Sequence, residues 1–175
     1  MKREIIIEAN GEKLAGWFYG GEAPAPLIIM SHGFSALMAM GLDDYAARFA
    51  QAGFAVLVYD HRNYGASSGW PRNETDPWQQ VEDMRAVISY ARNLDGVDPA
   101  CIGLWGTSYS GGHALTVSAL DDHPVGKSSS PAEDLGLLAR SCYRPESLLY
   151  PEPGVALADA FPPVQALRKT DMTPI

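Results

Sequence analysis

The chain has 175 residues, of which 46% are hydrophobic and 19% charged, enough for one globular domain with its own core but not for two. Its 21 acidic and 13 basic residues leave a formal net charge of −8, and Lys and Arg form no cluster along the sequence. This balance argues against nucleic acid and anionic membranes as partners. No apolar stretch approaches the roughly 18 residues of a membrane span, so we expect no transmembrane segment.

The termini and the cysteines indicate a reducing compartment. The N-terminus reaches Glu4 before any apolar run of signal-peptide length, and the two cysteines, Cys101 and Cys142, are expected to be free thiols. The C-terminal residues 173–175 resemble no peroxisomal Ser-Lys-Leu signal. We therefore expect a cytoplasmic location, and we expect no cofactor and no metal.

The N-terminal part of the sequence predicts a hairpin followed by a buried strand. Strands are expected over Glu4–Glu8 and Leu14–Tyr19, because the pair Asn10-Gly11 between them tolerates the positive φ of a tight turn. After a segment rich in glycine and proline, the uninterrupted apolar run Leu27–Met30 predicts a strand that is covered on both faces.

Helices and strands then alternate. A helix is expected over Leu42–Ala52, with Gly53 at its C-terminal cap, and it leads into a second buried strand over Phe54–Tyr59. Residues 76–79, Asp-Pro-Trp-Gln, have the pattern of a capping box with proline at the first helical position. The helix that follows is expected to bury Val81, Met84, Ile88 and Ala91.

Asp98-Pro99 is expected to break the chain before a third apolar strand over Ile102–Trp105 and a helix over Ser108–Leu120. Short apolar strands that alternate with helices favour a parallel sheet with helices on both faces, because parallel strands need crossover connections. The sequence therefore predicts an α/β fold over residues 1–120, a three-layer sandwich with a mostly parallel sheet.

The composition changes after residue 120. Eight of the thirteen prolines fall in the last 55 residues, and no strand pattern continues there. Short helical turns are conceivable around Asp134–Arg140 and Val164–Lys169, but proline-rich sequence without apolar periodicity favours disorder. We therefore predict that residues 121–175 form a divergent, poorly ordered tail.

The segment 106–112, Gly-Thr-Ser-Tyr-Ser-Gly-Gly, is the candidate nucleophile site. Acyl chemistry needs a hydroxyl held at a sharp strand-to-helix turn with small neighbours, and Ser108 occupies the centre of such a segment after a predicted strand and before a predicted helix. The usual pattern has glycine two residues after the nucleophile, where this chain has Ser110.

Ser31-His32-Gly33-Phe34 follows the first buried strand, where the second donor of an oxyanion hole is expected. The backbone N–H groups of Phe34 and Tyr109 are the candidate donors. Alternatively, His32-Gly33 forms only a tight turn between a strand and a helix.

A polar loop over residues 59–69 leaves the second buried strand. With residues 31–36, 76–80 and 105–113, it makes the first 120 residues or so resemble the α/β-hydrolase superfamily. More narrowly, these segments look like a fungal group of α/β-hydrolases found with polyketide biosynthesis genes. Some members of that group are polyketide transferases, and related members belong to toxin pathways.

The resemblance implies Ser108 as nucleophile and Phe34 and Tyr109 as oxyanion donors. In this superfamily the catalytic acid and histidine follow the nucleophile along the chain. The only histidines after Ser108 are His113, which is expected to pack within its helix, and His123, which begins the tail. Neither matches the expected position of the base.

His32, Asp60 and His61 are the other candidate residues that line the site. Asp60 and His61 follow the second buried strand. His61 could therefore serve as an improvised base, with the Asp60 carboxylate as its partner. In the alternative and favoured interpretation, Asp60 bonds Arg62 or loop amides and holds the loop. An unactivated serine is a weak nucleophile at neutral pH.

Two functions follow from this pattern. The first is an acyl-ester hydrolase or acyltransferase of secondary metabolism that acts on a small hydrophobic substrate through Ser108. The second is an inactive remnant that binds an apolar ligand or an intact paralogue. We expect a truncated gene product that lacks the C-terminal strands, with strand Ile102–Trp105 left as an edge open to association. A dinucleotide-binding fold is excluded because the first strand-to-helix turn has no glycine fingerprint.

Overall fold

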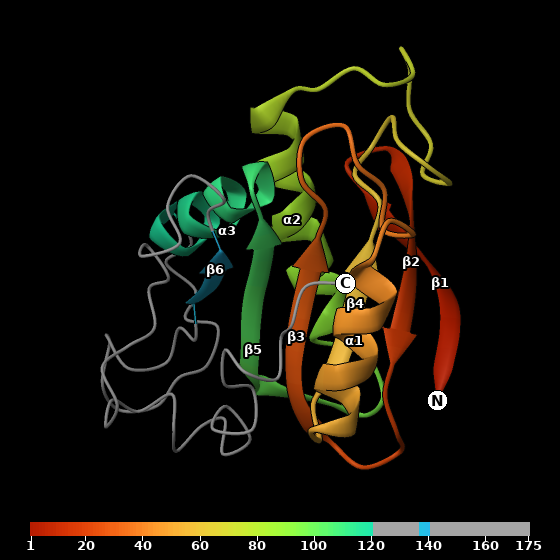
Figure 1. The fold of residues 1–175 in the computed structure, drawn as a ribbon, viewed down its shortest axis with the longest axis vertical. Coiled ribbons are helices and arrows are strands. Elements are labelled where there is room, and N and C mark those ends of the chain that lie inside the picture. Colours follow the sequence, from red (N-terminus) through yellow and green to blue (C-terminus); the bar gives the residue numbers. More distant parts are fainter. Residues whose placement is uncertain (121–136, 141–175) are drawn as a thin grey trace.

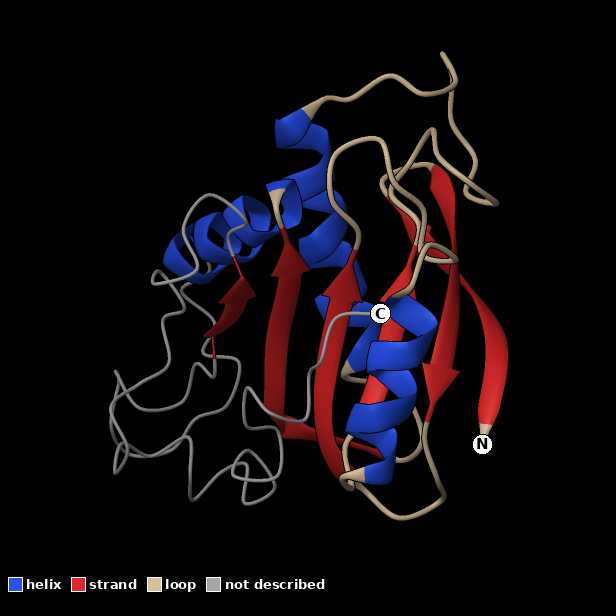
Figure 2. Cartoon of the chain, in the orientation of Figure 1, coloured by secondary structure: helices blue, strands red, loops and turns tan. Residues whose placement is uncertain are grey.

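The computed structural model describes residues 1–120 and 137–140, and within these residues one mixed sheet carries helices on both sides (Figures 1 and 2). The strands are β1 (Lys2–Ala9), β2 (Glu12–Tyr19), β3 (Ala25–Ser31), β4 (Ala55–Tyr59), β5 (Val97–Thr107) and β6 (Leu137–Arg140). The helices are α1 (Leu42–Gln51), α2 (Pro77–Ala91) and α3 (Tyr109–Leu120). The order of the strands in the sheet is β1-β2-β4-β3-β5-β6.

The predicted hairpin is confirmed. β1 and β2 pair antiparallel around Asn10, at a φ of 50°, and Gly11, at a φ of 86°, the positive values that the tight turn requires. β2 also pairs antiparallel with β4, whereas β3 pairs parallel with both β4 and β5. The hairpin thus adds two antiparallel strands beside β4, at one side of the parallel strands β4, β3 and β5.

The helices form a layer on each face of the sheet. In β3, Leu27 and Ile29 belong to the core that contains α2 and α3, whereas Ile28 and Met30 belong to the core that contains α1. Figure 1 shows α1 in front of the strands and α2 and α3 behind them. The fold is therefore the predicted three-layer α/β sandwich, and the apolar runs are continuous because both faces are covered.

β5 is longer than predicted. The pair Asp98-Pro99 does not break the chain, because both residues lie inside β5. The Asp98 carboxylate accepts a hydrogen bond from the Ala100 N–H at 2.9 Å, and the pairing of β5 with β3 shifts register between Ala25 and Leu27. A local irregularity thus accommodates the proline within the strand.

A short strand follows in the region that was predicted to lack one. β6 pairs parallel with the end of β5, from Leu104 opposite Leu137 to Thr107 opposite Arg140. The helical turn that was conceivable around Asp134–Arg140 is not what residues 137–140 form, and β5 is not the edge strand there. The other predictions for the tail, with Cys142, His123 and Val164–Lys169, lie outside the described residues.

The capping box at the start of α2 forms only in part. The Asp76 carboxylate accepts hydrogen bonds from the N–H groups of Trp78 and Gln79 at 2.9 and 3.1 Å, with Pro77 at the first helical position. The Gln79 side chain, however, accepts a hydrogen bond from Arg62 at 2.8 Å instead of returning to the cap. The helix start is thereby tied to the loop after β4.

The parallel strands place three connections at one edge of the sheet. β3, β4 and β5 run in the same direction, so the segments that follow their carboxyl ends lie together. Ligands of open α/β sheets bind at this edge. In the described part of the chain, no helix has the length and apolar character needed to cross a membrane.

Candidate active site

The turn between β5 and α3 has the strained backbone of a nucleophile elbow. Ser108 stands between Thr107, which ends β5, and Tyr109, which begins α3, and its φ is +53°. A left-handed conformation costs a residue with a side chain about 1–2 kcal/mol. Ser108 is partly exposed, and its hydroxyl forms no hydrogen bond with any other described residue. Within residues 1–120 and 137–140, the turn thus leaves the Ser108 hydroxyl without a hydrogen-bond partner.

Gly106 allows this turn to close. A Cβ atom at position 106 would lie 2.2 Å from the carbonyl oxygen of Ser110 and 2.6 Å from the backbone nitrogen of Gly111. Both contacts are with backbone atoms, which cannot swing away as a side chain can. The first glycine of the motif is therefore a steric requirement of the elbow.

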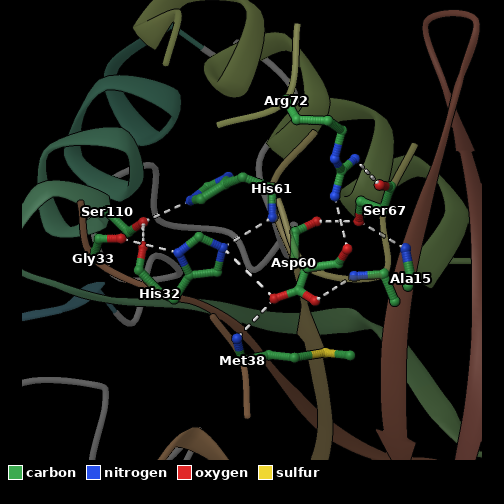
Figure 3. Close-up of polar contacts among 11 residues, drawn as sticks. Ala15, His32, Gly33, Met38, Asp60, His61, Ser67, Arg72 and Ser110 are labelled. Carbon is green, nitrogen blue, oxygen red and sulfur yellow. Dashed lines mark hydrogen bonds and ion pairs between the residues drawn. The ribbon is translucent and has the colours of Figure 1, made fainter. Parts of the chain in front are cut away.

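Ser110 stands where the usual motif has its second glycine, and its side chain is fully buried. Its hydroxyl donates a hydrogen bond to the His32 carbonyl and lies 2.8 Å from Nε2 of His61 (Figure 3). The departure from the usual pattern therefore has a definite structural consequence. A glycine here would leave both partners without this hydrogen bond.

The segment after β3, residues 32–36, lies directly against the elbow, and we call it the oxyanion loop. A Cβ atom at Gly33 would lie 3.3 Å from both Ser108 Cβ and the Thr107 carbonyl oxygen. The rings of Phe34 and Tyr109 meet edge to face, with centroids 5.7 Å apart. The two predicted oxyanion donors thus belong to residues in contact.

The backbone N–H groups of these two residues are available. Tyr109 is the first residue of α3, so its N–H has no acceptor within the helix. The Phe34 N–H has no acceptor among the described residues. Their assignment as oxyanion donors stays a prediction, and the arrangement is compatible with it.

His32 is buried and links two loops. Its Nε2 accepts a hydrogen bond from the His61 N–H at 3.1 Å, and its Nδ1 lies 2.9 Å from the Gly33 carbonyl. Nδ1 therefore carries the hydrogen. Burial lowers the pKa of His32, although the Gly33 carbonyl and the Asp60 charge oppose the shift. A neutral His32 thus holds the backbone around the elbow.

Asp60 holds loops instead of serving as a partner of His61. Its carboxylate accepts hydrogen bonds from the Met38 N–H at 2.7 Å and the Ala66 N–H at 3.2 Å. Its nearest imidazole contact is Nε2 of His32, at 3.8 Å. Of the favoured interpretation, in which Asp60 bonds Arg62 or loop amides, the structure shows the loop amides, whereas Arg62 bonds Asp83 and Gln79. The improvised pair of Asp60 and His61 does not form, because the His61 ring points to Ser110 (Figure 3).

His61 and His113 are buried beside the elbow as neutral rings. Burial, together with the nearby His32 and His113, holds the pKa of His61 well below its usual value. Burial also lowers the pKa of His113 to about 4, with a smaller contribution from His32. The ring of His113 packs edge-on against Tyr109 and His61, at centroid distances of 4.5 and 5.3 Å. His113 therefore packs, as expected.

No described histidine is bonded to the Ser108 hydroxyl. The His61 ring is engaged with Ser110, and neither ring nitrogen of His113 has a partner among the described residues. His123 lies outside the described part. A proton acceptor for Ser108 is therefore not found within residues 1–120 and 137–140. These residues also contain no group of three or more His, Cys, Asp or Glu arranged to hold a metal ion.

The scaffold of the loop after β4 was not predicted from the sequence. The Ser67 hydroxyl donates to the Asp60 carbonyl at 2.7 Å and accepts from the Ala15 N–H at 2.9 Å. Arg72 donates to the carbonyl groups of Ser67 and Gly65. Serine and arginine in a loop give no signal of such pairing, because their partners are distant backbone atoms.

The buried histidines predict loss of stability in acid. Their pKa values are lowered in the folded chain, so the unfolded chain binds more protons below its own histidine pKa of about 6.5. The free energy of unfolding should fall as the pH drops from about 6.5 towards 4, by up to about 1.4 kcal/mol per pH unit for each histidine. Urea unfolding between pH 7.5 and 4.5 measures this slope.

His113→Leu provides the matched variant, because it removes one titrating ring whose nitrogens have no described partner. The acid-dependent loss should be smaller in this variant than in the parent chain. An unchanged slope would show that His113 does not titrate as its burial implies.

The fold and the site together define an α/β-hydrolase: a central parallel sheet, a serine at a strained strand-to-helix turn, and a loop packed against it. The family model of the X-Pro dipeptidyl-peptidase (S15 family) matches residues 19–135, more than half of the chain. The chain belongs to this family.

Its relatives include proteins of fungal metabolism. A thiohydrolase from Aspergillus aculeatus is 42% identical over 116 residues, which are 66% of this chain and 36% of that protein. A polyketide transferase from Aspergillus fumigatus is 40% identical over 132 residues, which are 74% of this chain and 45% of that protein. The chain thus spans less than half the length of these relatives.

A solved structure gives the same result for the fold. The α/β-hydrolase GrgF from a Penicillium species superposes with a TM-score of 0.67 at 32% identity, over 69% of this chain and 42% of that structure. The predicted resemblance to α/β-hydrolases of fungal polyketide metabolism is therefore confirmed.

Proposed function

We propose that this chain carries the nucleophile and the oxyanion donors of a hydrolase or acyltransferase that acts on hydrophobic esters or thioesters in fungal secondary metabolism. The observation that carries the proposal is the conformation of Ser108, whose φ of +53° at the strand-to-helix turn is maintained despite its cost. The names of the relatives, a thiohydrolase and a polyketide transferase, support the reaction class.

In the proposed reaction, the Ser108 oxygen attacks the acyl carbon of the substrate and its proton passes to a base. The carbonyl oxygen becomes an oxyanion, which accepts hydrogen bonds from the N–H groups of Phe34 and Tyr109. The carbon–oxygen or carbon–sulfur bond then breaks, and the alcohol or thiol leaves with a proton. Water, or an acceptor alcohol in a transferase, takes the acyl group from Ser108.

Exposed apolar side chains support a hydrophobic substrate. Phe34 in the oxyanion loop is 65% exposed, and Trp78 at the start of α2 is 66% exposed. Burial raises the pKa of the Tyr109 phenol, and the charge of Asp76 at the start of α2 adds to this shift, which is consistent with a start of α2 near the elbow. Exposed aromatic groups around a reactive serine favour binding of an apolar acyl chain.

Labelling with a fluorophosphonate tests the nucleophile. The reagent forms a covalent bond with a competent serine, so the parent chain should be labelled and Ser108→Ala should not. Ser118→Ala is the matched control, because Ser118 lies in α3 and its hydroxyl bonds the Ala114 carbonyl within the same helix, at 2.7 Å. Mass spectrometry of the intact protein counts the label. Equal labelling of the parent and Ser108→Ala would contradict the proposal.

A non-catalytic, ligand-binding protein is the second candidate, and one observation favours it. The histidines near the elbow are buried and neutral, and none is bonded to Ser108 in the described residues. The same experiment separates the two candidates, since a parent chain that takes no label at all supports the second.

A further inference from the structure

The Ser110 hydroxyl joins three segments that meet at the elbow. Ser110 itself lies in the first turn of α3, His32 follows β3, and His61 follows β4. Ser110 and His32 are 78 residues apart in the sequence, so their hydrogen bond is a direct tie between the elbow and the oxyanion loop. All three side chains are buried, which makes this tie stronger than one exposed to water.

The directions of these hydrogen bonds are fixed by their chemistry. A carbonyl can only accept, so the Ser110 hydroxyl donates to the His32 carbonyl and its oxygen accepts from Nε2–H of His61. The His61 backbone N–H donates in turn to Nε2 of His32, whose Nδ1–H donates to the Gly33 carbonyl. These hydrogen bonds therefore connect Ser110 with both His32 and His61, His61 with His32, and His32 with Gly33.

Through Gly33, this hydrogen-bond network affects the position of the Phe34 N–H relative to Ser108. Gly33 lies against Ser108 and precedes Phe34, so any shift of this segment moves the Phe34 N–H relative to Ser108 and Tyr109. An oxyanion accepts well from both donors only when each is about 3 Å away. The segment also carries a strained residue, because Ser35, which follows Phe34, has a φ of +54°.

We propose that Ser110 is a positioning residue, whose hydroxyl, together with His61, locks the oxyanion loop onto the elbow and sets the separation of the two oxyanion donors. This inference rests on the proposed function, because it assigns Ser110 a role in the reaction of Ser108. A glycine at position 110, as in the usual motif, would have no group able to form this lock.

The test compares Ser110→Ala and Ser110→Gly with the parent chain and with Ser118→Ala, using the kinetics of fluorophosphonate labelling. The maximal labelling rate should fall about 10- to 100-fold in both Ser110 variants, since misplaced donors slow the reaction by such factors. The half-saturating reagent concentration should stay within about twofold of the parent value. Alanine favours the helical conformation more than serine does. If Ser110 contributed only to the stability of α3, the labelling rate of Ser110→Ala would therefore equal or exceed that of the parent chain.

Amide hydrogen exchange provides a readout that needs no reaction. Exchange in residues 33–38 should be faster in both Ser110 variants than in the parent chain and in Ser118→Ala. If the parent chain takes no label, the proposed function fails and the exchange rates alone decide whether Ser110 positions the loop. Ser110→Cys, which keeps the volume but bonds weakly, replaces either variant that fails to fold.

A labelling rate within twofold of the parent value in folded Ser110→Ala would overturn the inference. Unchanged exchange in residues 33–38 would overturn it as well.

Discussion

Gly106→Ala is expected to lower the free energy of unfolding by about 3 kcal/mol. The added Cβ would lie 2.2 Å from the Ser110 carbonyl oxygen, so the backbone of the first turn of α3 must move. The strained φ of Ser108 depends on this backbone, and fluorophosphonate labelling should be lost together with the stability. Urea unfolding monitored by circular dichroism gives the first quantity, and intact mass spectrometry gives the second.

Gly112→Ala is the matched control in the same helix. A Cβ at Gly112 meets no atom within 4 Å other than the neighbouring backbone of its own helix, and the position is exposed. Alanine loses less backbone entropy than glycine in a helix, so this variant should be more stable than the parent by about 1 kcal/mol, with labelling retained. If both glycine variants changed stability in the same direction, the close approach at Gly106 would not be the cause.

The layers of the fold were predictable because burial on both faces leaves a mark in the sequence. The runs Leu27–Met30 and Phe54–Tyr59 have no polar residue, and they form the β3 and β4 strands at the centre of the sheet. The helical periodicity of α1 and the pair Asn10-Gly11 are equally local signals. Each of these features is decided within about ten residues of chain.

Features decided by distant contacts were not predictable. Asp98-Pro99 has the local pattern of a chain break, yet pairing with β3 keeps it within β5. β6 is four residues long and carries no alternating pattern, and its strand conformation is evident only from its pairing with β5. Pairing energy that comes from a partner strand is invisible in a single sequence segment.

The candidate site divides in the same way. Ser108, Gly33 and Phe34 were recognised because the motif places them at strand ends, and the structure brings their segments together. The sequence marks Ser110 only as a departure from the motif, since its partners His32 and His61 lie far away in the sequence. A sequence shows that a residue is unusual, but only the fold shows what its side chain bonds.

Asp83→Ala is expected to destabilise the chain by about 3 kcal/mol, because it leaves the largely buried charge of Arg62 without its carboxylate partner. Asp83 accepts two hydrogen bonds from the Arg62 guanidinium, at 2.6 and 2.5 Å, and its side chain is fully buried. Arg62 follows His61 in the chain. Loss of the Arg62–Asp83 ion pair should therefore also make the loop that carries His61, a partner of Ser110, more mobile. Urea unfolding and the labelling rate should both register the change.

The double variant Arg62→Met with Asp83→Leu distinguishes the effect of the ion pair from the effect of the side-chain volume. Apolar side chains of similar volume remove the unpaired charge, so the double variant should be more stable than Asp83→Ala. Glu82→Gln is the control, because Glu82 pairs with Arg85 on the exposed side of the same helix, at 3.0 Å. Exposed pairs contribute little, so this variant should stay within about 0.5 kcal/mol of the parent. A similar loss of unfolding free energy in Glu82→Gln and Asp83→Ala would contradict this prediction, because the buried and the exposed ion pair would then contribute equally. The contacts between α2 and the loop after β4 would in that case depend on the apolar face of α2 alone.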